Sequence, residues 1–131
     1  MYANTDHKND FFKAEDAAWE AEKKEAKYIL SERARARRTI SYSELIDEIS
    51  SVNFEAYDLQ FFKFLGEISS EENKEGRGML TVLVVHKNGD MQPGLGFFEL
   101  AKYLGRDTSD VLQCWISELN KVFSVWSKES S

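Results

Sequence analysis

The sequence predicts an α+β protein that is mostly helical and forms one domain. Residues 12–37 are rich in Ala, Glu, Lys and Arg and contain neither Gly nor Pro, which is typical of one long helix. Residues 79–85 form an apolar run broken only by Thr81, which is typical of a short strand covered on both faces. With 131 residues, 42% of them hydrophobic, the chain can form one core. We assign residues 11–128 to that domain and residues 1–10 to a polar, mobile tail.

The first part of the chain supplies the long helix, a brief strand and a short helix. Apolar side chains recur near helical spacing along the long helix, which we otherwise expect to be largely exposed: Phe12, Trp19, Ala26, Ile29, Leu30 and Ala34. Residues 39–42 are few and include two β-branched side chains, which predicts a brief strand. Ser43 is the expected N-cap of a short helix that continues to about Ile49 with Leu45 facing inward.

Residues 54–72 predict the central helix of the fold. Its apolar face is too broad for a helix on the surface and is formed by Phe54, Tyr57, Leu59, Phe61, Phe62, Phe64, Leu65 and Ile68. We expect Glu67, Glu71 and Glu72 to lie on the opposite, solvated side of this helix. A polar segment that ends in glycine then leads to the apolar strand.

The remaining segments contain two turns and two helices. Asn88-Gly89 supplies the positive φ angles of a hairpin turn, and residues 93–96 form a second bend before a helix over residues 97–104. A glycine directly after this helix is a typical C-terminal stop. Asp107 or Thr108 is the expected cap of the last helix.

Composition limits the classes of function. The formal net charge of -6 and the pI near 5.0 disfavour general electrostatic capture by nucleic acid or anionic lipid. The single cysteine, Cys114, excludes an internal disulfide, and no apolar run is long enough to span a bilayer. The first residues also lack the apolar core of a signal peptide. We therefore expect a cytoplasmic protein without a membrane partner.

Three motifs carry a resemblance to a known kind of protein: TISYSELIDEI at residues 39–49, LTVLVV at residues 80–85 and PGLGFF at residues 93–98. Together with the order of elements, they resemble a group of uncharacterised small bacterial winged-helix-like proteins. The resemblance covers about the central half of the chain. It implies a winged-helix-like core, to which this chain adds a long N-terminal helix and a C-terminal helix, and it implies no known reaction.

The last helix carries the candidate protein interface. Apolar residues repeat along it at alternating steps of three and four: Leu112, Trp115, Leu119, Val122 and Trp126. Tryptophan is enriched at interface hot spots, so this stripe predicts a homodimer seam or a groove for a partner protein. The alternative is that the last helix docks on the long first helix and buries the stripe inside the fold.

A basic run at residues 32–38 is the main nucleic-acid signal. The candidate contacts are Arg33, Arg35, Arg37 and Arg38 in this run, with Lys87 and Asn88 at the expected wing. Arginines in the last turn of a helix also complement its dipole and need no ligand. The outward side chains of the expected central helix are mainly acidic and would repel the phosphates beside a DNA groove.

No set of residues predicts catalysis, a metal site or a cofactor. His86 and Cys114 each lack a sequence neighbour that would activate them, and the glycines at 94 and 96 lack the rest of a phosphate-binding motif. An enzyme would require a pocket that joins His86 with Glu99 or another carboxylate and a third polar group. We therefore expect a non-enzymatic bacterial protein that acts through protein contacts as an adaptor, regulator or inhibitor, with a DNA-binding regulator as the alternative.

Overall fold

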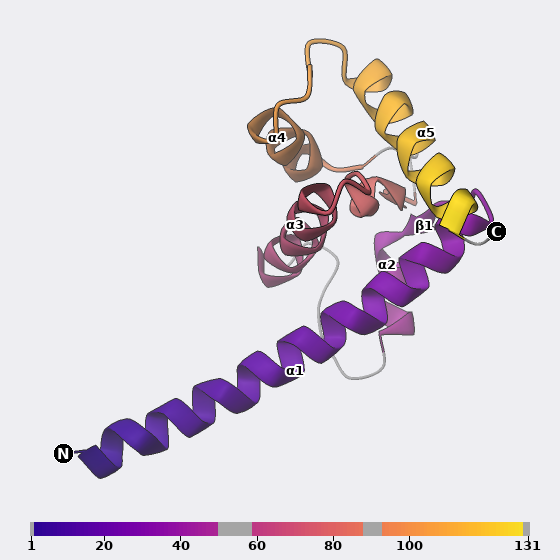
Figure 1. Ribbon diagram of the computed structural model, residues 1–131. Helices are drawn as coiled ribbons and strands as arrows, with labels where there is room; N and C mark the ends of the chain where they lie inside the picture. The colour runs from indigo at the N-terminus through magenta and orange to yellow at the C-terminus, as the bar shows by residue number, and fades with distance from the viewer. Residues whose placement is uncertain (1, 50–58, 88–92, 130–131) are drawn as a thin grey trace.

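The structure, a computed structural model, describes residues 2–49, 59–87 and 93–129, with side chains described over 17–49, 60–87 and 93–127. The described residues form five α-helices, one 3₁₀ turn and two short strands, which confirms a mostly helical α+β fold (Figure 1). In chain order these are α1 (Tyr2–Arg35), β1 (Ile40–Ser41), α2 (Tyr42–Glu48), α3 (Leu59–Lys74), η1 (Leu80–Leu83), β2 (Val84–Val85), α4 (Leu95–Tyr103) and α5 (Val111–Glu129).

Helix α1 is longer than the sequence predicted. It begins at Tyr2 rather than near Phe12, so the expected tail of residues 1–10 is largely part of the helix, while its mobility stays a prediction. Ala26, Leu30 and Ala34 are fully buried, which confirms the predicted inward face. This face packs against η1 and α5, and α1 also contacts α3 closer to its N-terminus.

The apolar run at residues 79–85 is buried as predicted, but most of it is not a strand. Only Val84 and Val85 are extended, and Leu80–Leu83 form a 3₁₀ turn. The Thr81 N–H donates to the side-chain oxygen of Ser69 on α3, at 3.1 Å, instead of to a neighbouring strand. Because β1 has only two residues, it pairs only with the end of the run, and other backbone groups of the run find partners elsewhere. The Met79 N–H donates to the Glu118 carboxylate at 2.7 Å, and the Val82 N–H donates to the Met79 carbonyl at 2.9 Å.

The two strands pair in parallel, with Ile40 opposite Val84 and Ser41 opposite Val85. The hairpin turn predicted at Asn88-Gly89 lies outside the described residues. A winged helix has an antiparallel wing, whereas the described residues contain only this parallel pair. The winged-helix identity therefore stays a prediction.

Two helix caps differ from the sequence predictions. Ser41, not Ser43, caps α2, because its side-chain oxygen accepts from the Glu44 N–H at 3.2 Å and the Glu44 carboxylate accepts from the Ser41 N–H at 3.3 Å. Asp110, rather than Asp107 or Thr108, caps α5 by accepting from the Gln113 N–H at 3.1 Å.

The helices predicted over residues 54–72 and 97–104 are present as α3 and α4. Helix α3 ends at Lys74, two residues later than predicted, and its predicted start lies outside the described residues. Helix α3 places Phe61, Phe64 and Ile68 in the core without solvent exposure, while Phe54 and Tyr57 lie outside the described residues. Helix α4 starts two residues earlier than predicted and is followed by Gly105, whose φ of 94° is the left-handed value that favours glycine at this position.

Candidate functional site

An apolar groove is lined by residues of both α3 and α4. These two helices contact each other and are labelled in Figure 1. Its volume is about 670 Å³, within the range of about 300–1,000 Å³ typical of binding sites. Its apolar walls are Phe62, Leu65 and Gly66 of α3 with Leu95, Phe97 and Leu100 of α4. Phe62 is 37% exposed and Leu95 is 75% exposed, so apolar side chains reach the surface from both walls.

Tyr42, His86 and Gly94 meet in this groove. The Gly94 N–H donates to the Tyr42 hydroxyl at 2.8 Å, and the Tyr42 and His86 rings lie 5.0 Å apart. A Cβ atom at position 94 would lie 3.1 Å from the Tyr42 hydroxyl oxygen and 3.3 Å from His86 Nε2. Glycine therefore permits the close approach that brings the start of α4 against the strand end.

Charged and hydroxyl groups occur at separate points of the groove. Lys63 lies on the α3 wall and Glu99 on the α4 wall, and both are exposed. Thr81 also lines the groove, but its hydroxyl is hydrogen-bonded to the hydroxyl of Ser69. Among the described residues, the groove thus presents an ammonium group and a carboxylate on opposite walls, and the hydroxyls of Tyr42 and Thr81 are both hydrogen-bonded within the protein.

The groove contains both His86 and Glu99, the pair that the sequence analysis required for an enzyme. Among the described residues that line it there is no cysteine or serine to act as a nucleophile. Within the described part of the chain, no three His, Cys, Asp or Glu side chains gather to hold a metal ion. The described side chains of the groove can hold a ligand with a polar group.

Most of the predicted interface stripe faces inward. Val122 is fully buried, and Trp115, Leu119 and Trp126 are partly buried against the core. The indole N–H of Trp115 donates to the Val82 carbonyl at 3.2 Å. Leu112, in contrast, is 47% exposed. Helix α5 therefore docks on α1 and η1 through most of the stripe, as the alternative interpretation described.

Two of the candidate nucleic-acid arginines make contacts within the fold. Arg33 donates to the Thr39 carbonyl at 3.1 Å and forms an ion pair with Glu48 at 3.3 Å. Arg35 forms an ion pair with Glu32 at 2.8 Å, and its guanidinium carbon lies 5.3 Å from the centre of the Trp126 ring. The Arg33 contact with Glu48 joins the end of α1 to α2, and the Arg35 contact with Trp126 joins it to α5.

The other candidates are placed as follows. The guanidinium of Arg37, a residue with a φ of 56°, lies 5.8 Å from the centre of the Phe123 ring. Arg38 and Lys87 are exposed, and Asn88 lies outside the described residues. The structure thus holds Arg33 and Arg35 in contacts within the fold and leaves Arg37, Arg38 and Lys87 exposed.

The glutamates of α3 correct a sequence prediction. Glu67 and Glu71 face α1, and Glu72 is only 2% exposed, so none of the three lies on a free solvated face. Glu67 accepts from the Trp19 indole N–H at 2.7 Å, and Glu71 pairs with Lys23 at 2.6 Å and with Lys27 at 2.7 Å. We call this contact between Trp19, Lys23 and Lys27 of α1 and Glu67 and Glu71 of α3 the charged seam.

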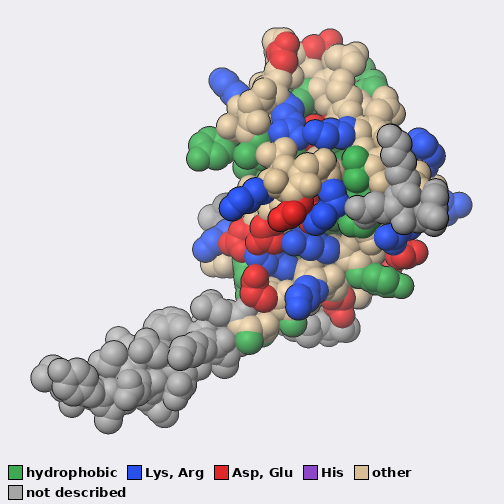
Figure 2. Space-filling model, in the orientation of Figure 1, with side chains coloured by type: hydrophobic (Ala, Val, Ile, Leu, Met, Phe, Trp, Pro, Cys, Tyr) green, Lys and Arg blue, Asp and Glu red, His purple; other side chains and the backbone are tan. Residues whose placement is uncertain are grey.

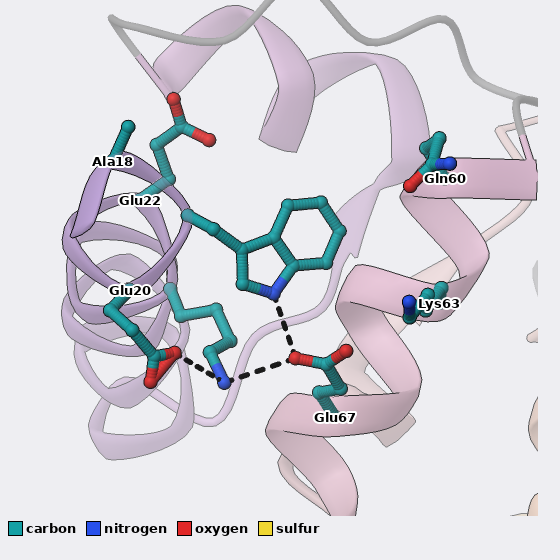
Figure 3. A pocket seen from close by; sticks show the side chains of 8 residues that line it. Ala18, Glu20, Glu22, Gln60, Lys63 and Glu67 are labelled. Atoms are coloured by element: carbon teal, nitrogen blue, oxygen red, sulfur yellow. Dashed lines mark hydrogen bonds and ion pairs between the residues drawn. The ribbon is translucent and has the colours of Figure 1, made fainter. Parts of the chain in front are cut away.

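Figure 3 shows the part of the charged seam around Glu67, which points from α3 towards α1. This part of the seam borders an open polar hollow of about 900 Å³. Cationic and acidic side chains are interleaved on the visible face over these two helices (Figure 2). Burial acts to lower the pKa of Lys23, but hydrogen bonds to Glu20, Glu71 and Glu67 outweigh burial and raise it. Burial likewise acts to raise the pKa of Glu71, but hydrogen bonds from Lys23 and Lys27 lower it.

A second buried carboxylate lies on α5. Glu118 is 4% exposed and accepts from the Met79 N–H at 2.7 Å and from two guanidinium nitrogens of Arg106 at 2.9 Å each. These bonds hold its pKa below the ordinary value, although burial acts to raise it. Cys114, one turn earlier, is buried, and burial together with the Glu118 charge raises its pKa, which disfavours a reactive thiolate.

No family model, curated protein or solved structure matches the chain. Among the described residues, no helix has the length and apolar character needed to cross a membrane.

Proposed function

We propose that the chain is a non-enzymatic binding protein whose α3–α4 groove receives an amphipathic helix of a partner protein. The observation that carries the proposal is the open apolar groove, with Phe62 and Leu95 exposed on its two walls. A groove between two helices is a common receptor for the apolar face of a third helix. Through this contact the protein would act as an adaptor, regulator or inhibitor in a bacterial cytoplasm.

The size of the groove supports this occupant. Helix α4 has nine residues and is therefore about 14 Å long. Apolar anchors at positions i, i+3 or i+4, and i+7 of a partner helix span about 10 Å along its axis. Two turns of a partner helix therefore match the length of the α4 wall.

The charges on the groove suggest an orientation for the partner. Lys63 lies on the α3 wall and Glu99 on the α4 wall. A partner helix with an acidic residue towards α3 and a basic residue towards α4 would complement both. Charge pairs at such a rim contribute more to specificity and association rate than to affinity.

A small molecule is the second candidate occupant, because His86 and Glu99 line the same groove. Apolar walls with a few polar groups are also typical of small-molecule sites. DNA binding is supported less well, since Arg33 and Arg35 are half-buried and make contacts within the fold. A winged-helix-like core fits any of these functions.

A display library of 16-residue amphipathic helices tests the proposal. We expect selected helices to carry large apolar residues at i, i+3 or i+4, and i+7, and to bind at least about tenfold more weakly to Phe62→Glu and Leu95→Glu. Both positions are exposed, so the variants should stay folded, which circular dichroism checks. Tyr28→Glu, 67% exposed on α1, is the matched control and should bind normally.

Three results would count against the helix-binding groove. The first is a selection that enriches no helix, and the second is a set of binders that keep their affinity for both groove variants. The third is the binding of a small-molecule fragment that shifts the NMR signals of His86 and Glu99 while no helix competes with it. The third result would favour the second candidate.

A further inference from the structure

Gly66 lies in the middle of α3, is half-buried and lines the α3–α4 groove. In the interior of a helix, glycine is the least favourable residue after proline, and alanine is the most favourable. Three causes can favour glycine at such a position: a positive φ angle, a neighbour that lies too close for a Cβ atom, or a ligand that needs the space.

The described part of the fold does not require this glycine. Gly66 is not among the glycines with a positive φ. Apart from its chain neighbours and the backbone of its own helix, a Cβ atom at position 66 would meet one described atom within 4 Å, which is Leu100 Cδ2 at 3.9 Å. At Gly94, in contrast, a Cβ atom would lie 3.1 Å from the Tyr42 hydroxyl oxygen. Alanine would therefore fit at position 66, and its methyl group would occupy space in the groove.

The groove has two levels along α3. At the first level, the Tyr42 ring lies 6.4 Å from the Phe62 ring, and the Tyr42 hydroxyl accepts from the Gly94 N–H at the start of α4. At the second level, one turn later on α3, Gly66 faces Leu100 of α4. The two levels are about 6 Å apart, which is also the spacing of anchors at i and i+4 on a partner helix. Each level can therefore receive one anchor.

We propose that Gly66 determines the size of the anchor at the second level, which is a large apolar side chain packed on the backbone of α3 and on Leu100. This inference rests on the helix-binding groove proposed above. Without a Cβ atom at position 66, a leucine or phenylalanine of the partner can contact the α3 backbone directly. A short side chain such as alanine would leave this level unfilled and would lose these contacts.

The proposal predicts that one methyl group changes stability and binding in opposite directions. Gly66→Ala should raise the midpoint of urea denaturation, because alanine favours the helix and fits beside Leu100. The same methyl group takes the space of the anchor, so a helix selected against the wild type should bind about threefold or more weakly, measured by calorimetry. Ser70→Ala also raises helix propensity in α3, lies outside the groove lining and should leave binding unchanged.

An exchange of size between groove and helix identifies the anchor. Gly66→Leu should weaken binding of the selected helix at least about tenfold, in a chain that circular dichroism shows to be folded. The apolar anchors of the helix are then replaced by alanine one at a time. For one anchor only, the loss caused by Gly66→Leu should fall below about threefold, because the shortened side chain makes room for the leucine. If Gly66→Leu does not fold, the result for Gly66→Ala decides alone.

A Gly66→Ala chain that binds the helix as tightly as the wild type, or more tightly, overturns this inference. So does a loss in Gly66→Leu that stays the same whichever anchor is shortened. In both cases, helices that bind weakly to Phe62→Glu and Leu95→Glu still support the groove as the site. If no helix is selected, or if the binders keep their affinity for those two variants, the proposed function fails and this inference fails as well.

Discussion

Helix α1 packs against α3 through one kind of contact and against η1 and α5 through another. Towards its N-terminus, the charged seam joins it to α3 through carboxylates, ammonium groups and an indole N–H. Towards its C-terminus, Ala26, Leu30 and Ala34 pack without solvent exposure against η1 and α5. We call this second contact the apolar seam. Within a few turns, the same helix therefore packs through polar side chains at one contact and through apolar side chains at the other.

The two seams differ in what they contribute. The apolar seam removes hydrocarbon from water and should supply most of the stability. In the charged seam, the Lys23 side chain is 5% exposed, while Glu67 and Glu71 are 34% and 44% exposed. The free-energy cost of desolvation is therefore borne mainly by Lys23, and it offsets much of the attraction between Lys23 and the two glutamates. Such pairs fix the position of one helix on another more than they add net stability.

The largest expected effect comes from the apolar seam. Leu30→Ala should lower the free energy of unfolding by about 2–5 kcal/mol, because a fully buried leucine leaves a cavity. Urea denaturation followed by circular dichroism measures the change. Tyr28→Ala, two residues earlier and 67% exposed, is the control and should change stability by no more than about 0.5 kcal/mol. A loss below about 1 kcal/mol for Leu30→Ala would mean that α1 is not fixed by this seam.

A smaller effect is expected in the charged seam. Lys23→Met keeps the aliphatic stem but removes the charge that pairs with Glu20, Glu67 and Glu71. We expect a loss of about 1–3 kcal/mol, because the glutamates then face one another while solvent and Lys27 compensate in part. The same denaturation experiment applies.

Lys24→Met is the matched control for Lys23→Met, since Lys24 is exposed on the same helix. It should leave stability nearly unchanged. If both substitutions had equal effects, the loss would reflect the general charge of α1 rather than the charged seam. A Lys23→Met loss larger than that of Leu30→Ala would reverse the ranking of the two seams.

The apolar seam was more predictable from the sequence than the charged seam. Helical spacing alone identified Ala26, Leu30 and Ala34, because periodicity reports which side of a helix is apolar. The same reasoning placed Glu67 and Glu71 towards solvent. Their partners lie on α1, 44 to 48 residues away, and no local pattern records such a pairing.

Long-range contacts also explain the other misses. The sequence pattern predicted a strand over the whole apolar run. In the structure, the Thr81 N–H instead donates to the hydroxyl oxygen of Ser69, 12 residues away, and Leu80–Leu83 form a 3₁₀ turn. The groove was missed because Tyr42 and Gly94 are 52 residues apart. Sequence patterns predicted which segments of the chain are helical. Hydrogen bonds between distant residues fix the position of the α3–α4 groove, and no local pattern records them.

The smallest expected effect is the pH dependence of the charged seam. Because hydrogen bonds from Lys23 and Lys27 lower the pKa of Glu71, this carboxylate adds stability above its ordinary pKa of 4.5, and that contribution is lost as the pH falls through the lowered value. Glu71→Gln should therefore be less stable than the wild type at pH 7, and the difference should shrink as the pH falls below 4.5. It should stay below about 1 kcal/mol, since solvent screens the half-exposed group.

Urea denaturation of wild type and Glu71→Gln at several values from pH 7 down to pH 3 measures this difference. Lys23 stays charged throughout this range because its pKa is raised, so it adds no pH dependence of its own. Glu75→Gln, at an exposed position just beyond α3, removes one negative charge outside the seam and serves as the control. A difference between Glu71→Gln and the wild type that stays constant with pH would show that the Glu71 charge is not coupled to folding. The charged seam would then position α1 through the geometry of its hydrogen bonds and not through the charge of Glu71. The two seams would differ in how their side chains pack and not in how they respond to pH.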